Sequence, residues 1–182
     1  MRKVFKHFII LFLTVSCVSK EFNQDELNDA ALFHSAMQNL SDIIVYDIFS
    51  PPVASRVYLY PSIAAYELMA KDMPLKYKSL VGQVKGLTKI PEPDKIFKNY
   101  NLNLTILFAF NKVGRALIFS DELMDKFEKR FNDKLISMGV PKKIKTASEK
   151  YAERVAKHIL NWAKDDLYNQ TRTYSKYTIL ED

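Results

Sequence analysis

Apolar residues recur every three or four positions through much of the chain, the spacing that places them on one face of an α-helix. This periodicity predicts a first helix over residues 25–47. The apolar positions of this stretch are Leu27, Phe33, Met37, Leu40 and Ile44, and Ile48 continues the pattern just beyond it. The segment Ser50-Pro51-Pro52 ends the pattern, because proline has no amide hydrogen and disfavours helix at the residue before it.

Three further helices are expected in the middle of the chain. One covers residues 53–69, where Pro61 either kinks the helix or starts a new one at Ser62. A short helix over residues 75–87 is loosened by two glycines. After a proline-containing loop, the cap Asp94 precedes a helix over residues 95–117.

Two helices complete the prediction. Ser120 is the expected N-cap of a helix that ends near Gly139. The last helix is expected to begin with Thr146 and Glu149, a capping box, and to run to about residue 167. No long strand-like alternation occurs, and four glycines leave few tight hairpins. The sequence therefore predicts an all-α bundle of about five to six helices.

The first residues have a different character. A positive start is followed by a short apolar run and then by Ser16 and Cys17, which resembles a bacterial lipoprotein signal. Acylated Cys17 would make the chain an exported, membrane-anchored lipoprotein of the cell envelope, in the periplasm or at the outer membrane. Because Thr14 replaces the usual leucine, ordinary signal cleavage without lipidation is the alternative. The expected organisation is a signal over 1–16, a helical domain over 17–170 and a polar connecting segment over 171–182.

Composition narrows the classes of function. Hydrophobic residues make up 48% and charged residues 26%, which is ordinary for a folded domain. The formal charge is +6, but Arg2, Lys3 and Lys6 lie in the expected signal, so the rest carries only +3. With no basic stripe containing aromatics, we expect no nucleic-acid partner. The single cysteine excludes a disulfide within the chain.

Candidate chemistry is sparse in the expected domain. His34 and His158 stand on separate predicted helices, which is a weak signal for a metal site, and surface or core-edge roles are favoured. Asp165 and Asp166 are adjacent, so their side chains point about 100° apart on a helix, and a solvated helix end is the better interpretation. These patterns predict no catalytic residue, no metal ligand and no cofactor-binding residue in the chain.

Several stretches nevertheless resemble a known family. The longest runs from Asp42 to Arg56 (DIIVYDIFSPPVASR) and continues through residues 63–67 (IAAYE). The others are Tyr77-Lys78-Ser79-Leu80 with Gly82 and Leu87, Ala109-Phe110 with Phe119-Ser120, and Trp162-Ala163-Lys164-Asp165-Asp166 with Thr171-Arg172. In this order they resemble the N-terminal helical region of exported vanadium-dependent haloperoxidase-like proteins of the type 2 phosphatidic acid phosphatase superfamily, as found in Bacteroidetes.

The resemblance implies an anion pocket that this sequence does not supply. Enzymes of that family hold phosphate or vanadate with a lysine, two arginines and histidines, and no Arg-Pro or Ser-Gly-His segment occurs here. Ser55-Arg56 matches part of one motif, but Ser62 stands where a histidine would be needed. Arg56 or Lys164 would at most support the anion, and a surface salt bridge is the favoured role of each. Vanadate or phosphate is thus expected only in a full-length relative.

The resemblance also implies that the sequence stops in the connecting segment, before the catalytic motifs. Three explanations for this ending are possible: a shortened or split gene, a fragment, or a helical domain kept for another task. We expect the chain to be inactive alone and to contact a missing C-terminal catalytic half or to self-associate. The alternative is a non-catalytic helical envelope lipoprotein that acts as an interaction module.

Overall fold

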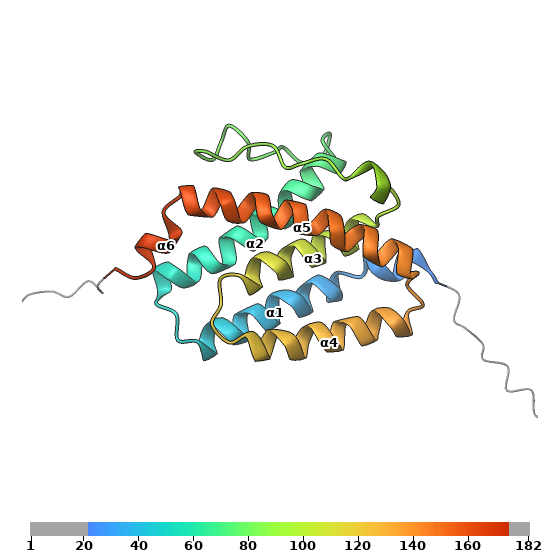
Figure 1. Ribbon diagram of the computed structural model, residues 1–182, viewed down its shortest axis with the longest axis horizontal. Helices are drawn as coiled ribbons and strands as arrows, with labels where there is room; N and C mark the ends of the chain where they lie inside the picture. Colours follow the sequence, from blue (N-terminus) through green and yellow to red (C-terminus); the bar gives the residue numbers. More distant parts are fainter. Residues whose placement is uncertain (1–21, 175–182) are drawn as a thin grey trace, which may run out of the picture.

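Six α-helices and two short 3-10 helices form the part of the chain that the computed structural model describes, residues 22–174 (Figure 1). They are η1 (Gln24–Asn28), α1 (Ala30–Tyr46), α2 (Pro51–Asp72), η2 (Lys95–Phe97), α3 (Leu102–Arg115), α4 (Asp121–Ser137), α5 (Lys142–Asp165) and α6 (Tyr168–Thr171). Within these residues the only β-type pairing is an isolated bridge between Val81 and Val84. The all-α prediction is confirmed, whereas the expected signal, Cys17 and residues 175–182 lie outside the described residues.

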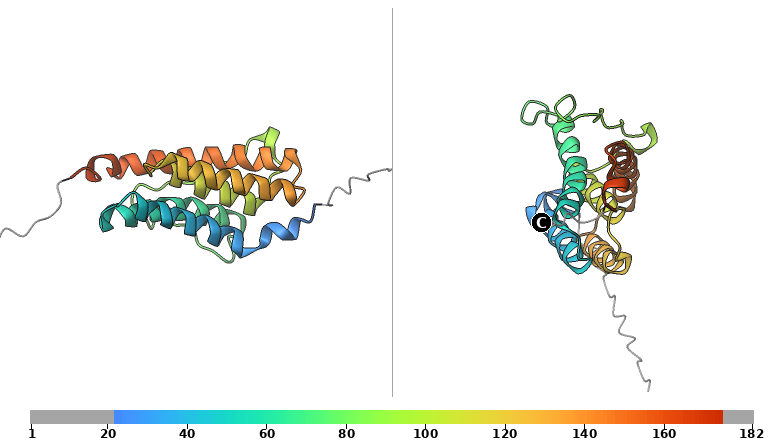
Figure 2. Two further views of the ribbon diagram at one scale, coloured as in Figure 1. Left: turned by 90° about the horizontal axis from the view of Figure 1, so that it is seen from below. Right: turned by 90° about the vertical axis from the view of Figure 1, so that its left-hand side faces the viewer.

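The helix α3 lies at the centre of the bundle. It packs against α5, α2 and α1, while α4 lies along the outer side of α1 (Figures 1 and 2). The long segment between α2 and α3 crosses the far side of α5 and contributes Leu87 and Ile90 to the core. Burial of the apolar stripes that these helices share is the main stabilising contribution expected for such a bundle.

Three helices approach one another closely at Gly114 of α3. A Cβ atom at this position would lie 3.2 Å from Leu40 Cδ1 of α1 and 3.8 Å from Pro61 Cγ of α2. Pro61 is buried, and α2 runs through it as one helix, so no new helix starts at Ser62. The absence of a side chain at Gly114 therefore lets α3 lie directly against both neighbours.

The first two helix predictions that the structure corrects were too long. The expected helix over residues 25–47 is divided at Asp29, whose side chain accepts a hydrogen bond from the Ala31 amide and caps α1. The expected helix over residues 95–117 is divided between η2 and α3, because Asn101 caps α3 through the Leu104 amide. Asp94 is the predicted cap, although it caps the short η2 and not α3.

The structure also corrects the predicted helix over residues 75–87 and the predicted start of the last helix. Residues 75–87 form turns and not a helix, because Gly82 and Gly86 adopt positive φ angles of 81° and 76°. The helix α5 begins at Lys142 and not at Thr146, since Pro141 already has the φ of −60° that suits a helix start. Thr146 and Glu149 therefore lie inside α5 and form no capping box.

No helix among the described residues is both long enough and apolar enough to cross a membrane.

Candidate functional site

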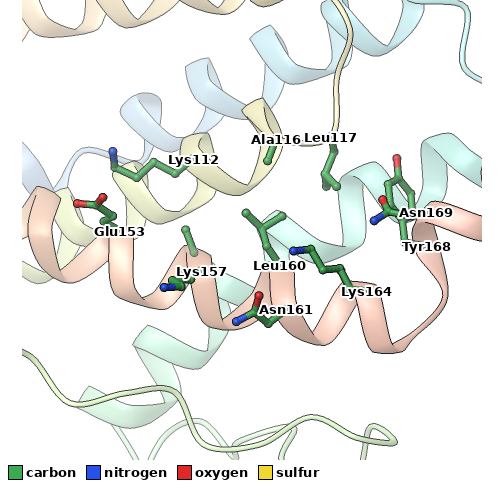
Figure 3. A pocket seen from close by; sticks show the side chains of 12 residues that line it. Lys112, Ala116, Leu117, Glu153, Lys157, Leu160, Asn161, Lys164, Tyr168 and Asn169 are labelled. Atoms are coloured by element: carbon green, nitrogen blue, oxygen red, sulfur yellow. The ribbon is translucent and has the colours of Figure 1, made fainter.

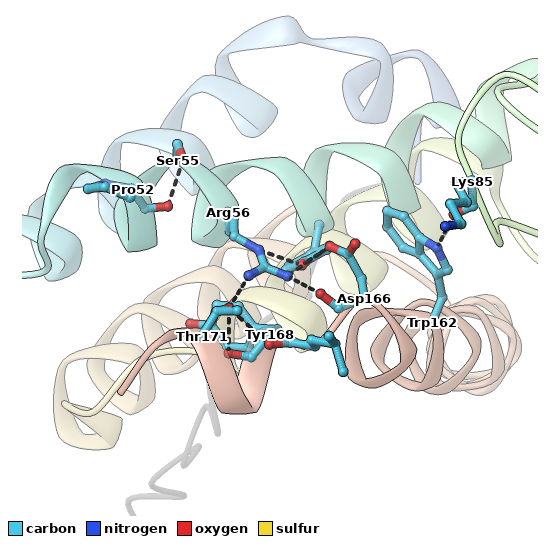
Figure 4. Close-up of polar contacts among 10 residues, drawn as sticks. Pro52, Ser55, Arg56, Lys85, Trp162, Asp166, Tyr168 and Thr171 are labelled. Atoms are coloured by element: carbon cyan, nitrogen blue, oxygen red, sulfur yellow. Dashed lines mark hydrogen bonds and ion pairs between the residues drawn. The ribbon is translucent and has the colours of Figure 1, made fainter. Parts of the chain in front are cut away.

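Arg56 of α2 joins the end of α5 to α6 (Figure 4). Its Nε donates to the Tyr60 hydroxyl at 2.8 Å, and its Nη2 donates to both the backbone carbonyl (2.7 Å) and Oδ2 (2.8 Å) of Asp166. Its Nη1 donates to the hydroxyl of Thr171 in α6. We call Arg56, Tyr60, Asp166 and Thr171 the α6 clamp. Every nitrogen of the guanidinium has a partner within it.

The charges of the α6 clamp are partly shielded from water. The exposed fraction of the side chain is 22% for Arg56 and 48% for Asp166, while Tyr60 is fully buried. Burial and the hydrogen bond that the Tyr60 hydroxyl donates to Asp166 raise the pKa of Tyr60 above its ordinary value. Burial lowers the pKa of Arg56, but its contacts with Tyr60 and Asp166 outweigh that effect and raise it. The clamp is therefore built around a neutral phenol and one ion pair.

Aromatic rings extend this contact across the end of the bundle. Two guanidinium groups contact the Tyr168 ring: Cζ of Arg56 lies 5.2 Å and Cζ of Arg172 lies 5.5 Å from the ring centroid. Arg172 also lies 4.6 Å from the Phe119 ring, which stacks on Phe49 at 4.9 Å. The loop before α2, the loop before α4 and the helix α6 are thus held together by rings and cations.

Asp47 makes a second link between distant segments. Its Oδ2 accepts hydrogen bonds from the backbone amides of Phe119 at 2.8 Å and Ser120 at 3.3 Å, and its Oδ1 accepts from the Ser120 hydroxyl. Ser120 is the N-cap of α4, as predicted, but its own side chain makes no capping bond to the helix. The carboxylate at the C-terminal end of α1 therefore fixes the two residues that lead into α4.

Two further links hold the segment between α2 and α3. The buried carboxylate of Glu67 accepts from the Ser79 hydroxyl and the Leu80 amide, both at 2.7 Å. The Trp162 indole donates to the Lys85 carbonyl at 3.1 Å, beside Gly86 (Figure 4). Several residues in the stretches that resemble haloperoxidase-like proteins are thus partners of one another across the bundle.

The sequence-predicted site residues are not brought together. His34 is exposed on α1, and Nε2 of His158 lies 3.0 Å from the Thr88 carbonyl oxygen. No group of three or more histidine, cysteine, aspartate or glutamate residues suited to a metal occurs in the described part of the chain. A vanadate or phosphate site needs free cations beside a histidine, and Arg56 is occupied by Asp166 and Thr171. The described residues do not fit that group.

A groove of about 550 Å³ lies between α3 and α5 (Figure 3). Leu117 and Leu160 supply its larger apolar side chains, and Lys112, Lys157 and Lys164 supply its cations. The remaining lining residues are Ala116, Glu153, Ala156, Asn161, Ala163, Tyr168 and Asn169. This volume lies within the range of ordinary ligand pockets. The lining residues of α5, however, extend over about three turns of the helix, so the site is elongated.

Sequence reasoning missed the groove, although a signal for it is present. On α5, the small residues Ala156 and Ala163 are seven residues apart, and Lys157 and Lys164 repeat the same interval one position later. Lys164 was expected to form a surface salt bridge, but it has no ion pair within residues 22–174, whereas Arg56 has the predicted one. Asp165 lies exposed at the helix end as predicted, while the neighbouring Asp166 belongs to the α6 clamp.

The chain was compared with families, curated proteins and solved structures. No family model matches it, and no curated protein matches it significantly. It is similar to a solved structure described as the crystal structure of the first bacterial vanadium-dependent iodoperoxidase, with 38% sequence identity and a TM-score of 0.71. The match covers 82% of this chain and 35% of the iodoperoxidase, so the chain spans about a third of that protein's length. The described residues therefore form a haloperoxidase-like helical bundle.

Proposed function

We propose that this chain is the helical framework of an exported vanadium-dependent haloperoxidase-like protein and that it has no halide-oxidising or phosphatase activity on its own. The observation that carries the proposal is the 38% identity to an iodoperoxidase over 82% of the chain. Contacts across the bundle support the framework role, because several side chains of the stretches that resemble the family bond to one another.

The occupied guanidinium of Arg56 supports the predicted lack of activity. An oxyanion could reach Arg56 only by displacing the carboxylate of Asp166, which also accepts a hydrogen bond from Tyr60 at 2.7 Å. No histidine lies among the residues that bond to Arg56. Arg56 and its partners thus offer no free cation beside a histidine for the charge that develops on a five-coordinate vanadium or phosphorus centre.

An assay of the purified chain tests this proposal directly. The chain is incubated with orthovanadate, peroxide and iodide or bromide, and separately with p-nitrophenyl phosphate, with an active vanadium-dependent haloperoxidase as the positive control. We expect no turnover above that of free vanadate. Turnover that depends on the protein and is retained in Arg56→Met would contradict the proposal and would indicate another site.

A chimera tests the framework role separately. The region of the iodoperoxidase that matches this chain is replaced with residues 22–174, and iodide oxidation is measured after the fold has been checked. We expect a folded chimera that retains activity, because the bundle supplies support and not chemistry. A folded chimera without bound vanadate would indicate that this bundle does not replace its counterpart.

We also propose that the chain is exported and anchored to the membrane of the cell envelope through an acylated Cys17, which lies outside the described residues. The sequence order of positive start, apolar run and Cys17 supports this. Fatty-acid labelling of the expressed chain, with Cys17→Ser as the control, should label only the parent. Label retained in Cys17→Ser would exclude this anchor.

A second candidate function is a non-catalytic interaction module, and the exposed apolar side chains at the α6 end of the bundle favour it. Tyr46, Ile48 and Phe119 are 68%, 85% and 62% exposed, and they lie where α1 ends and α4 begins. Such a patch favours self-association. Sedimentation over a range of concentrations should then show a dimer that Ile48→Glu abolishes, whereas a monomer at all concentrations would argue against this candidate.

A further inference from the structure

The groove between α3 and α5 is open along its length. Figure 3 shows its side chains arranged along α5, with Glu153 towards one end and Tyr168 and Asn169 at the other. Lys112 of α3 and Leu117, in the turn just after α3, lie on the opposite wall. From Glu153 to Lys164 the α5 wall extends about 16 Å, at about 1.5 Å per residue. An open, linear site of three helical turns matches an extended or helical segment better than a compact molecule.

The floor of the groove suits close approach of a helix. Ala116, Ala156 and Ala163 are small, and half-buried Leu160 rises between the two alanines of α5. Small residues let two helix backbones approach, and a single larger side chain between them fixes the register. The arrangement predicts an occupant with an apolar stripe at intervals of three and four residues.

Two of the three lysines that line the groove have no ion-pair partner within the described part of the chain. Lys112 lies 3.6 Å from Glu149, but Lys157 and Lys164 have no ion pair among residues 22–174. Glu153 is the one acidic residue of the lining. The two free lysines are seven residues apart, about two turns and about 10 Å along the helix axis. Two carboxylates at the same interval on a second helix would face them.

The end of the groove holds one further unsatisfied group. The Tyr168 residue is 2% exposed, and its hydroxyl has no hydrogen-bond partner within the described residues. Burial raises the pKa of Tyr168, although the positive charges of Arg172 and Arg56 oppose this, so the group is a neutral phenol. A buried hydroxyl without a partner costs free energy that a polar group arriving at that end would recover.

We propose that the groove between α3 and α5 binds an amphipathic α-helix that carries carboxylates two turns apart, supplied by the polypeptide that holds the anion site in haloperoxidase-like proteins. The identity of that polypeptide rests on the proposed function above, whereas the helical and acidic character of the occupant rests on the groove alone. The groove of the helical framework would then be the binding site for a helix of the catalytic part.

The first experiment uses two labelled synthetic helical peptides of about fifteen residues, each with leucines at positions i, i+4 and i+7. One has glutamates seven residues apart beside the leucine stripe, and the other has lysines there. Fluorescence anisotropy with the whole chain should show binding of the glutamate peptide, and Lys157→Glu/Lys164→Glu should weaken it about fivefold, as expected for two exposed ion pairs. The same variant should bind the lysine peptide more tightly than the parent does.

Matched variants separate the groove from general charge. Lys126→Glu/Lys129→Glu, at exposed positions of α4, should leave both affinities unchanged. Leu160→Ser should weaken both peptides equally, and circular dichroism verifies that each variant is folded. Equal loss in the α4 variant, or no binding of either peptide, would overturn the proposal. Displacement of the peptide by inorganic phosphate but not by chloride at matched ionic strength would also overturn it and would assign the groove to a small anion.

The chimera described above distinguishes failure of this inference from failure of the proposed function. If Lys157→Glu/Lys164→Glu reduces both peptide binding and the activity of the chimera, the occupant belongs to the catalytic part. If the peptide binds in the groove but the chimera has no activity, the groove is a helix site and the framework role is wrong. An active chimera that the double variant leaves unchanged would overturn the inference alone.

Discussion

Lys164 and Asp166 are two residues apart at the end of α5, yet they have different surroundings. Asp166 faces α2, where Arg56 and Tyr60 bond to it, and Lys164 faces the groove, where no described acidic group pairs with it. The comparison between the α6 clamp and the groove teaches that charge alone identifies neither role. A charged group whose bonds are completed inside the bundle supports the fold, whereas one that remains unpaired is available for binding.

A substitution of Arg56 is the strongest test of this difference between the α6 clamp and the groove. Arg56→Met removes the donor that joins Tyr60, Asp166 and Thr171, and it should lower the free energy of unfolding by about 2 kcal/mol, because the buried Tyr60 hydroxyl and the half-exposed Asp166 carboxylate each lose one of their partners. The matched variant Lys164→Met should change it by less than about 0.5 kcal/mol. Urea denaturation measures both. Similar losses in the two variants would mean that the clamp and the groove do not differ in this way.

Alkaline pH tests the same clamp through Tyr60. Burial and the bond to Asp166 raise the pKa of Tyr60 in the folded state, so below about pH 10 both states keep the proton and full stability is present. Above this pH the unfolded chain loses the proton first, and the free energy of unfolding should fall by at most about 1.4 kcal/mol per pH unit for this group.

Tyr60→Phe should therefore reduce the slope of stability against pH between about pH 10 and pH 12, at some cost in stability at neutral pH. Tyr58→Phe, two residues before the α6 clamp's tyrosine on α2, serves as the control. Denaturation at several pH values gives both slopes. If the free energy of unfolding of Tyr60→Phe and of the parent fell equally steeply with pH, folding would not raise the pKa of this hydroxyl.

The link between α1 and α4 should have a smaller effect. Asp47→Asn keeps the shape of the side chain but removes the charge that faces the Phe119 and Ser120 amides, and it should cost about 1 kcal/mol. Asp42→Asn, at an exposed position of the same helix, is the matched control. Thermal denaturation should separate the two variants. An unchanged midpoint for Asp47→Asn would mean that the loop before α4 is held by the Phe49 and Phe119 rings alone.

The smallest effect is expected in the groove. Lys157→Ala/Lys164→Ala should change the free energy of unfolding by less than about 0.5 kcal/mol, because neither lysine has an ion-pair partner among the described residues. Chemical denaturation of the double variant beside the parent provides the measurement. A loss above 1 kcal/mol would show that the lysines support the bundle and would remove the contrast with the α6 clamp.

Local patterns predicted the helical class well because apolar periodicity reports directly on which residues face a core. The helix α4, with Met124, Phe127, Phe131 and Leu135 buried, was predicted almost as observed. The predicted helix boundaries were wrong where a single capping residue determines the start of a helix, as Asp29 does for α1 and Asn101 does for α3. The prediction of a helix around Gly82 and Gly86 was wrong because the conformation of this segment depends on a distant residue. Glu67, thirteen residues before Leu80, accepts a hydrogen bond from the Leu80 amide.

The candidate site was harder to predict because it depends on contacts between distant residues. A salt bridge for Arg56 was expected, but nothing local identifies Asp166, 110 residues away, as its partner. The groove requires knowing that α3 and α5 lie side by side and that α4 does not cover their end. The sequence contains the interval between Lys157 and Lys164, but only the arrangement of helices gives that interval a meaning.

The close approach at Gly114 also determines how the molecule can open. Leu40, Pro61 and Gly114 all precede α4, so this contact needs no part of α5 or α6. The link from Arg56 to Asp166 instead closes a long loop with a few half-exposed bonds. Partial unfolding should therefore release α6 first while α1, α2 and α3 stay together, so amide hydrogens of Tyr168–Thr171 should exchange with solvent earlier than those around Gly114.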